Sequence, residues 1–155
     1  MVLKLFWLDV SLKRKQVKVE MEEFILLKIY VEKNNSSSRK LIKWLKRQKI
    51  DYEERYIDTK PLSEDELLNI MSFTENGFDD LFSYRAMKDM NLDEDSVDSL
   101  SVKELVRLMV KNPRLIRKPF AIKGKQMIVG YGKDQVQTLI PKERRLKAIL
   151  HYQFG

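Results

Sequence analysis

Residues 24–40 read Phe24-Ile25-Leu26-Leu27-Lys28-Ile29-Tyr30-Val31-Glu32-Lys33-Asn34-Asn35-Ser36-Ser37-Ser38-Arg39-Lys40, an apolar run followed by small polar and basic residues. The apolar run at 24–31 contains several β-branched residues, which is typical of a buried central strand. From Ser37 the apolar residues recur with the period of a helix, and residues 52–57 have the character of a second strand. This order predicts a β–α–β unit with parallel strands and a right-handed crossover.

The helix predicted after Ser37 has two different faces. Its apolar residues fall on one arc, and the opposite arc is basic. The apolar arc carries Leu41, Ile42, Trp44 and Leu45, and the basic arc carries Arg39, Lys40, Lys43, Lys46 and Arg47. We expect the first arc to pack on the sheet. The second arc is either a solvated face or a surface for a polyanion.

Helices and a hairpin are predicted after residue 60. Two stretches, at residues 63–66 and 101–104, have the sequence of capping boxes, which fix where a helix begins. The apolar residues between them predict one or two short helices. Residues 120–129 predict a β-hairpin around Gly124, and a last helix is expected to end before Pro141.

The chain has 155 residues and no cysteine. The start of a helix activates a thiol by favouring its thiolate, whereas a serine hydroxyl in the same place stays protonated. Disulfide formation and thiolate catalysis are therefore excluded for this chain. The sequence has no glycine-rich phosphate loop and no spacing of metal ligands, so neither a cofactor nor a metal is expected.

Length and composition fit one compact domain. We interpret residues 1–20 as an N-terminal extension, because the strand pattern does not continue smoothly from the basic residues before it, and residues 21–155 as a single domain. No apolar run is long enough to span a bilayer and no export signal is evident, so a cytoplasmic location without membrane contact is expected. The net charge of +7 favours an acidic or polyanionic partner.

Short segments along residues 24–145 share their order and spacing with one family. They are Ser37-Ser38-Arg39-Lys40 with Trp44-Leu45, Pro61-Leu62-Ser63, Phe73-Thr74-Glu75-Asn76-Gly77, Tyr84-Arg85, Asn112-Pro113 with Leu115-Ile116-Arg117-Lys118-Pro119, and Val129-Gly130-Tyr131. In these segments the chain resembles the Spx-type transcriptional regulators, which are relatives of the glutaredoxin-like arsenate reductases.

The resemblance implies an α/β fold, namely a thioredoxin-like mixed four-stranded sheet with a helical subdomain inserted at about residues 61–115. It also implies that Pro119 stands where such folds keep a cis proline. Members of the Spx branch bind the C-terminal domain of the RNA polymerase α subunit and alter promoter use, usually under thiol stress. Their contact glycine aligns with Gly77, so the expected polymerase-binding residues are Thr74, Glu75, Asn76, Gly77 and Phe78. Judged from its neighbours alone, Gly77 is a turn residue with positive φ.

Departures from the family pattern argue against catalysis and against a redox switch. The two family cysteines align with Asn35 and Ser38, which makes these degenerate switch positions. Of the three arginines that serve the reductases, Arg85 matches one, Lys118 replaces another, and the third has no counterpart. The planar guanidinium of arginine binds an oxyanion through two parallel hydrogen bonds, and the ammonium group of lysine cannot do so. We therefore expect no enzyme activity and assign supporting roles to Arg85, Arg117 and Lys118.

The leading hypothesis is a stress-response regulator of transcription that has no thiol switch, is monomeric when free and is controlled by its abundance, through a proteolytic adaptor. It would meet promoter DNA only within the polymerase complex, and the candidate DNA-facing residues are Lys43, Lys46, Arg47 and Lys88. The alternative is a redox-inactive glutaredoxin-like module that binds another protein or an anion at residues 35–38.

Overall fold

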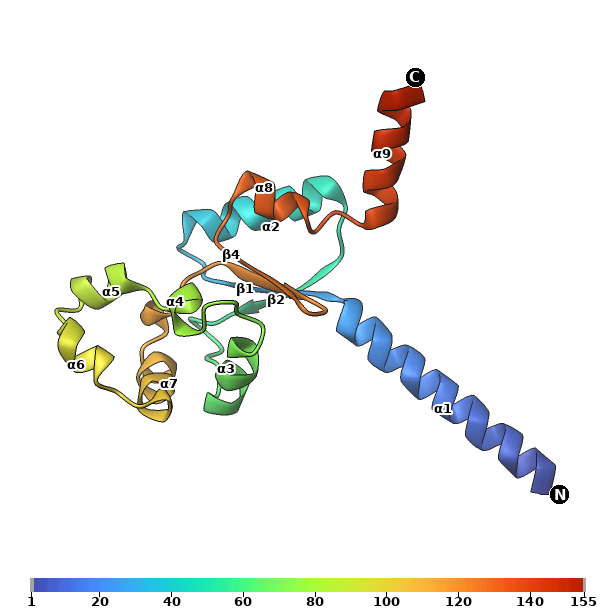
Figure 1. Ribbon diagram of the computed structural model, residues 1–155, viewed down its shortest axis with the longest axis horizontal. Coiled ribbons are helices and arrows are strands. Elements are labelled where there is room, and N and C mark those ends of the chain that lie inside the picture. The colour runs from blue at the N-terminus through green and yellow to red at the C-terminus, as the bar shows by residue number, and fades with distance from the viewer. Residues whose placement is uncertain (1, 155) are drawn as a thin grey trace.

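The computed structural model describes the backbone of residues 2–154, and the side chains of these residues apart from 2–8, 19–20, 22–24 and 154. Helices cover both faces of a central sheet, and a helix near each end of the chain projects away from it (Figure 1). Within the described residues, no helix combines the length and the hydropathy required to cross a lipid bilayer.

The sheet contains β1 (Leu27–Val31), β2 (Tyr52–Tyr56), β3 (Phe120–Lys123) and β4 (Gln126–Val129). Their spatial order is β2-β1-β3-β4. Strand β1 runs parallel to β2, while β3 is antiparallel to both β1 and β4. The predicted β–α–β unit, the hairpin and the mixed four-stranded sheet are therefore confirmed.

One face of the sheet is covered by α2 (Ser36–Gln48) and α8 (Lys133–Gln137) (Figure 1). Because side chains alternate along a strand, β1 sends Leu27, Ile29 and Val31 into this layer, where they are buried. They pack against the apolar arc of α2 that the sequence predicted. The basic arc of α2 is thereby turned away from the sheet.

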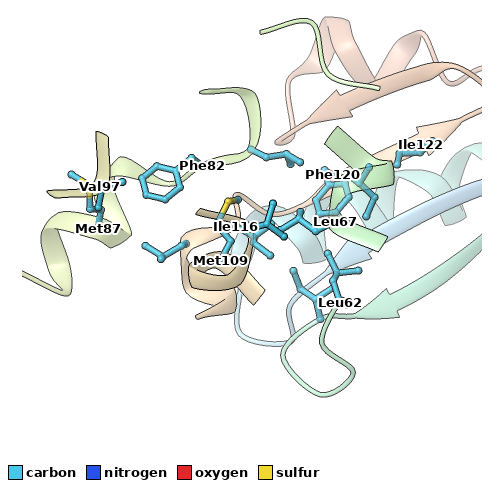
Figure 2. Close-up of a cluster of buried hydrophobic side chains, with 14 residues drawn as sticks. Leu62, Leu67, Phe82, Met87, Val97, Met109, Ile116, Phe120 and Ile122 are labelled. Atoms are coloured by element: carbon cyan, nitrogen blue, oxygen red, sulfur yellow. The ribbon is translucent and has the colours of Figure 1, made fainter. Parts of the chain in front are cut away.

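The other face is covered by the helices inserted between β2 and β3. These are α3 (Glu64–Met71), α4 (Phe78–Leu81), α5 (Tyr84–Asp89), α6 (Glu94–Asp98), α7 (Val102–Lys111) and the 3-10 turn η1 (Pro113–Leu115). Figure 2 shows the apolar cluster that joins them to the sheet, from Val97 and Met87 through Phe82 and Ile116 to Phe120 of β3. The predicted helical subdomain is thus continuous with the core of the sheet.

Local sequence signals account for the helix starts in this insertion. The capping boxes of α3 and α7 are both present, with reciprocal hydrogen bonds between Ser63 and Glu66 and between Ser101 and Glu104. Between the two boxes the sequence predicted one or two short helices, and the structure has α4, α5 and α6 there.

The start predicted for the first strand is wrong. Helix α1 (Val2–Ile25) continues through Phe24 and Ile25, and the strand begins only at Leu27. Residues 2–23 contain no glycine, asparagine or proline, the residue types that commonly end a helix, so the helix continues until Leu27 pairs with Tyr52 of β2. The backbone therefore has no break near residue 20, and the division into an extension and a domain stays a prediction. At the other end, α9 (Lys142–Phe154) projects from the molecule (Figure 1).

Arg55 of β2 ties the start of the insertion to the sheet. Its guanidinium pairs with the carboxylate of Glu66, with Nη2 donating to Oε2 at 3.0 Å, and it also donates to the carbonyl oxygens of Lys60 and Pro61. This hydrogen bonding, helped by the backbone N–H of Ser63, lowers the pKa of Glu66 from 4.5 to about 2. The turn into α3 is therefore stabilised by the ionised form of Glu66.

The pH dependence of stability should report this contact. Because the pKa of Glu66 is lower in the folded state, its contribution is complete above about pH 4.5 and is lost as the pH falls toward 2. Glu66→Gln should lower the free energy of unfolding by about 1 kcal/mol at pH 7, since these half-exposed charges are screened. The difference from wild type should shrink as the pH falls to 3, as measured by urea unfolding.

Asp65→Asn removes the same charge from the same helix turn and controls for the change in net charge, because Asp65 forms no ion pair with any described residue. A Glu66→Gln variant that stays equally destabilised at pH 7 and pH 3 would contradict the assignment.

Candidate functional site

The side chains at both degenerate switch positions accept backbone hydrogen bonds near the start of α2. The side chain of Asn35 accepts a hydrogen bond from the backbone N–H of Ser38 at 2.8 Å. Ser38 is only 1% exposed, and its hydroxyl oxygen accepts from the N–H of Glu32 at 3.2 Å. The first contact caps the helix start, and the second links the segment that follows β1 to α2. Both side chains therefore already have partners within the chain.

Lys118 and Glu32 form an ion pair beside this helix start. Tyr30 of β1 lies opposite Phe120 of β3, so the antiparallel register, continued by two residues, brings Glu32 to face Lys118. Lys118 Nζ lies 3.4 Å from Glu32 Oε2 and donates to the carbonyl oxygen of Pro113 at 2.9 Å. The Lys118 side chain is 5% exposed and that of Glu32 is 28% exposed. The cation at this position is thus neutralised by the chain itself.

A cleft of about 270 Å³ opens next to the ion pair. Its lining includes Asn35, Ser83, Arg114, Arg117, Lys118 and Gly130. The peptide bond before Pro119 is cis, as the resemblance implies. Arg85 is exposed on α5, is absent from the described lining of the cleft, and forms no ion pair with any described residue. The structure therefore brings Asn35, Arg117 and Lys118 together and leaves Arg85 apart.

The candidate polymerase-binding segment 74–78 is a turn held by hydrogen bonds. The carboxylate of Asp80 accepts from the N–H groups of Glu75 and Asn76, each at 2.9 Å, and from the side-chain amide of Asn76 at 3.1 Å. These hydrogen bonds hold the pKa of Asp80 below its ordinary value, and the one from the backbone N–H of Asn76 has the largest effect. The hydroxyl of Thr74 donates to the carbonyl oxygen of Met71 at 2.6 Å. The shape of the turn is therefore set within the free protein.

Gly77 occupies a conformation that side chains disfavour. Its φ is 66° and its ψ is −132°, so the predicted turn glycine with positive φ is confirmed. A Cβ atom placed on Gly77 would meet no heavy atom within 4 Å. Backbone conformation alone, and not crowding inside the chain, explains the glycine. The space beside it is open to a partner.

The turn is anchored on both sides. Phe73 and Phe78 pack against the apolar cluster of the insertion. Arg117 donates to the carbonyl oxygen of Asp80 at 3.2 Å. A groove of about 410 Å³ separates the turn from β4, and its lining includes Phe73, Thr74, Glu75, Arg117, Met127 and Val129. Arg117 lines both this groove and the cleft, which agrees with a supporting role.

The candidate DNA-facing residues lie on two different elements. Lys43, Lys46 and Arg47 are exposed on α2. Lys88 is exposed on α5, which belongs to the insertion on the opposite side of the sheet (Figure 1). Only the three residues of α2 therefore share a face.

Sequence reasoning missed three residues of this region, Glu32, Asp80 and Arg114. Only the register between β1 and β3 places Glu32 against Lys118. No local pattern marks Asp80, because Asx turns use N–H groups later in the chain, whereas the Asp80 carboxylate accepts from N–H groups four and five residues earlier. Arg114 lies in the 3-10 turn η1, which the sequence patterns did not predict.

Comparison with known proteins identifies similar sequences. The model of the ArsC family matches residues 30–139. A protein named global transcriptional regulator Spx from Streptococcus mutans is 40% identical over 120 residues, which cover 77% of this chain and 87% of that protein. The protein of the same name from Streptococcus pyogenes is 37% identical over 120 residues, covering 77% of this chain and 89% of its own length.

Solved structures of low sequence identity share the fold. An ArsC family related protein from Bacteroides fragilis superposes with a TM-score of 0.63 at 21% identity, covering 73% of this chain and 96% of its own. An arsenate reductase from Vibrio cholerae superposes with a TM-score of 0.60 at 22% identity, covering 74% of this chain and 98% of its own. At this level of identity the likeness supports the fold and carries no statement about activity.

Proposed function

The chain belongs to the ArsC family, and we propose that within it the protein is a regulator of transcription that docks on RNA polymerase. The relatives that are 37–40% identical are named global transcriptional regulators. Reductase chemistry would need a thiol, and this chain has no cysteine. A function based on binding is therefore favoured over catalysis.

The observation that carries the docking proposal is the fixed turn at residues 74–78. A preformed loop loses little conformational freedom when it binds, which favours its use as a contact surface. Glu75 and Asn76 are exposed at its tip, and the space above Gly77 is open. We assign this turn to the C-terminal domain of the polymerase α subunit, with Arg117 supporting it through Asp80.

We also propose how the activity of this regulator is controlled and where it acts. No cysteine stands at residues 35 and 38, where Asn35 caps α2 and Ser38 accepts from Glu32, so we propose that no thiol switch gates binding and that a proteolytic adaptor controls abundance. The free protein is monomeric and cytoplasmic. It meets promoter DNA only within the polymerase complex.

Binding to the purified α C-terminal domain, measured by calorimetry, tests the proposal. We expect a saturable complex whose dissociation constant is the same, within about twofold, with and without a thiol oxidant such as diamide, because there is no sulfhydryl to oxidise. The α C-terminal domain alone, treated with the same oxidant, is the control. The absence of binding in both conditions, or binding that requires the oxidant, would contradict the proposal.

A redox-inactive module that binds an anion is the second candidate, because Arg114, Arg117 and Lys118 line the cleft near Asn35. Two contacts weaken it. Asn35 already occupies the N–H of Ser38, and Glu32 already neutralises Lys118. A titration with inorganic phosphate, followed through the amide signals of Ser36 and Ser37, separates the two candidates.

A further inference from the structure

The exposed side of α2 is a continuous basic surface. We call it the α2 basic face, and it consists of Arg39, Lys40, Lys43, Lys46 and Arg47. Helix α2 contains no acidic residue. Lys40, Lys43, Lys46 and Arg47 form no ion pair with any described residue, and Arg39 donates to the carbonyl oxygen of Lys33. The charges of this face are therefore available to an external partner.

Charge is divided unevenly between the two sides of the sheet. Residues 61–115 carry twelve acidic and six basic side chains, a net charge of −6. The whole chain carries +7, so the rest of the chain carries +13. In Figure 1 the insertion lies below the sheet and α2 above it. The acidic insertion and the α2 basic face consequently point in opposite directions, and one does not neutralise the other.

The start of α9 extends the basic surface at the C-terminal end of α2. Arg144 of α9 donates from Nη1 to the carbonyl oxygen of Gln48, the last residue of α2. This contact satisfies one of the carbonyl groups left free at the helix end. Arg144 itself is exposed, so it adds one basic side chain at this end of α2.

We propose that the α2 basic face binds the phosphate backbone of double-stranded DNA without reading its base sequence, weakly in the free protein and at a promoter only once the polymerase complex holds it there. The face runs over the nine residues from Arg39 to Arg47, and the eight steps between them span about 12 Å at 1.5 Å per step. One DNA strand presents a phosphate about every 3.4 Å along the axis, so the face can meet three or four of them. Residues 39–47 contain no asparagine or glutamine, and Arg39, one of the two arginines, already donates to the carbonyl oxygen of Lys33, so the face has few groups with which to read base edges.

DNA fits this face better than an anionic membrane surface does. A helix that binds a bilayer needs an apolar side free to enter it. Leu41 and Leu45, on the apolar side of α2, are fully buried against the sheet. The choice of DNA among other polyanions rests on the proposed function, because a regulator at the polymerase works next to duplex DNA.

Fluorescence anisotropy with a labelled 25-base-pair duplex of arbitrary sequence tests the proposal. Three or four phosphate contacts predict a log–log salt slope of about −3 to −4, and hence a loss of affinity of about 10²-fold between 50 and 200 mM salt. The triple variant Lys43→Gln/Lys46→Gln/Arg47→Gln should reduce the magnitude of the slope by about 3 and weaken binding at 50 mM salt at least tenfold.

The matched control is Lys13→Gln/Arg14→Gln/Lys15→Gln, which removes the same charge from α1 and should change the affinity by less than about threefold, since those residues lie outside the face. Equal losses in the two triple variants, a slope near zero, or tighter binding to phosphatidylserine vesicles or to duplex RNA would overturn the proposal. Binding of the triple variant of helix α2 to the C-terminal domain of the polymerase α subunit is measured separately, in the absence of DNA. Failure of that complex would contradict the proposed function and leave the DNA result standing.

Discussion

Gly77→Arg should weaken binding to the polymerase α C-terminal domain by at least about 100-fold, or about 2.7 kcal/mol, while the domain stays folded. An arginine there would fill the open space beside the turn, where we place the partner. It would also be strained by the positive φ, at a cost of about 1–3 kcal/mol in the free energy of unfolding. Calorimetry measures the affinity, and urea unfolding measures the stability.

Gly77→Ala is the matched control for this strain. Since a Cβ atom at this position meets no neighbour within 4 Å, alanine and arginine bear the same backbone cost and differ only in what projects outward. The alanine variant should therefore lose the same stability and keep its affinity within about fivefold, or about 1 kcal/mol. Unchanged affinity in the arginine variant would remove residues 74–78 from the interface.

Glu32→Gln should lower the free energy of unfolding by about 2 kcal/mol. The substitution leaves the ammonium group of Lys118 buried beside a neutral amide, with only the carbonyl oxygen of Pro113 as a strong partner. Removing one member of a buried pair costs up to about 3–5 kcal/mol, and the partial exposure of Glu32 reduces that loss. Urea unfolding at pH 7 measures it.

A double-mutant cycle isolates the pair. Lys118→Met removes the buried charge and keeps most of the volume, and the carboxylate of Glu32 then remains partly hydrated. The double variant Glu32→Gln/Lys118→Met should be more stable than Glu32→Gln alone by about 1 kcal/mol. Additive effects of the two substitutions would show that the ion pair contributes nothing.

The elements of the fold were largely predictable because their signals are local. The period of the apolar residues predicted α2 and its buried arc, the capping boxes predicted where α3 and α7 begin, and Gly124 marked the hairpin between β3 and β4. The error at Phe24 arose because an apolar run adjoins both a helix and a strand. Only pairing with β2 decides where such a strand begins.

The candidate site was predictable in part. Motif order located the turn around Gly77 and the degenerate positions Asn35 and Ser38, but not what these residues contact. The packing of the insertion places Arg85 outside the cleft. It also places Lys88 across the sheet from α2. The sequence pattern of each helix contains no information about the orientation of one helix relative to another.

The sequence by itself determined the class of fold, the loss of thiol chemistry and the strongly basic arc of α2, because each follows from residue types or from neighbours a few positions apart. The tertiary structure alone decided that Glu32 meets Lys118, that Arg117 supports the turn through Asp80, and that basic and acidic surfaces face opposite ways. These contacts join residues far apart in the chain. Strand register and packing of the insertion, rather than local preference, bring them together.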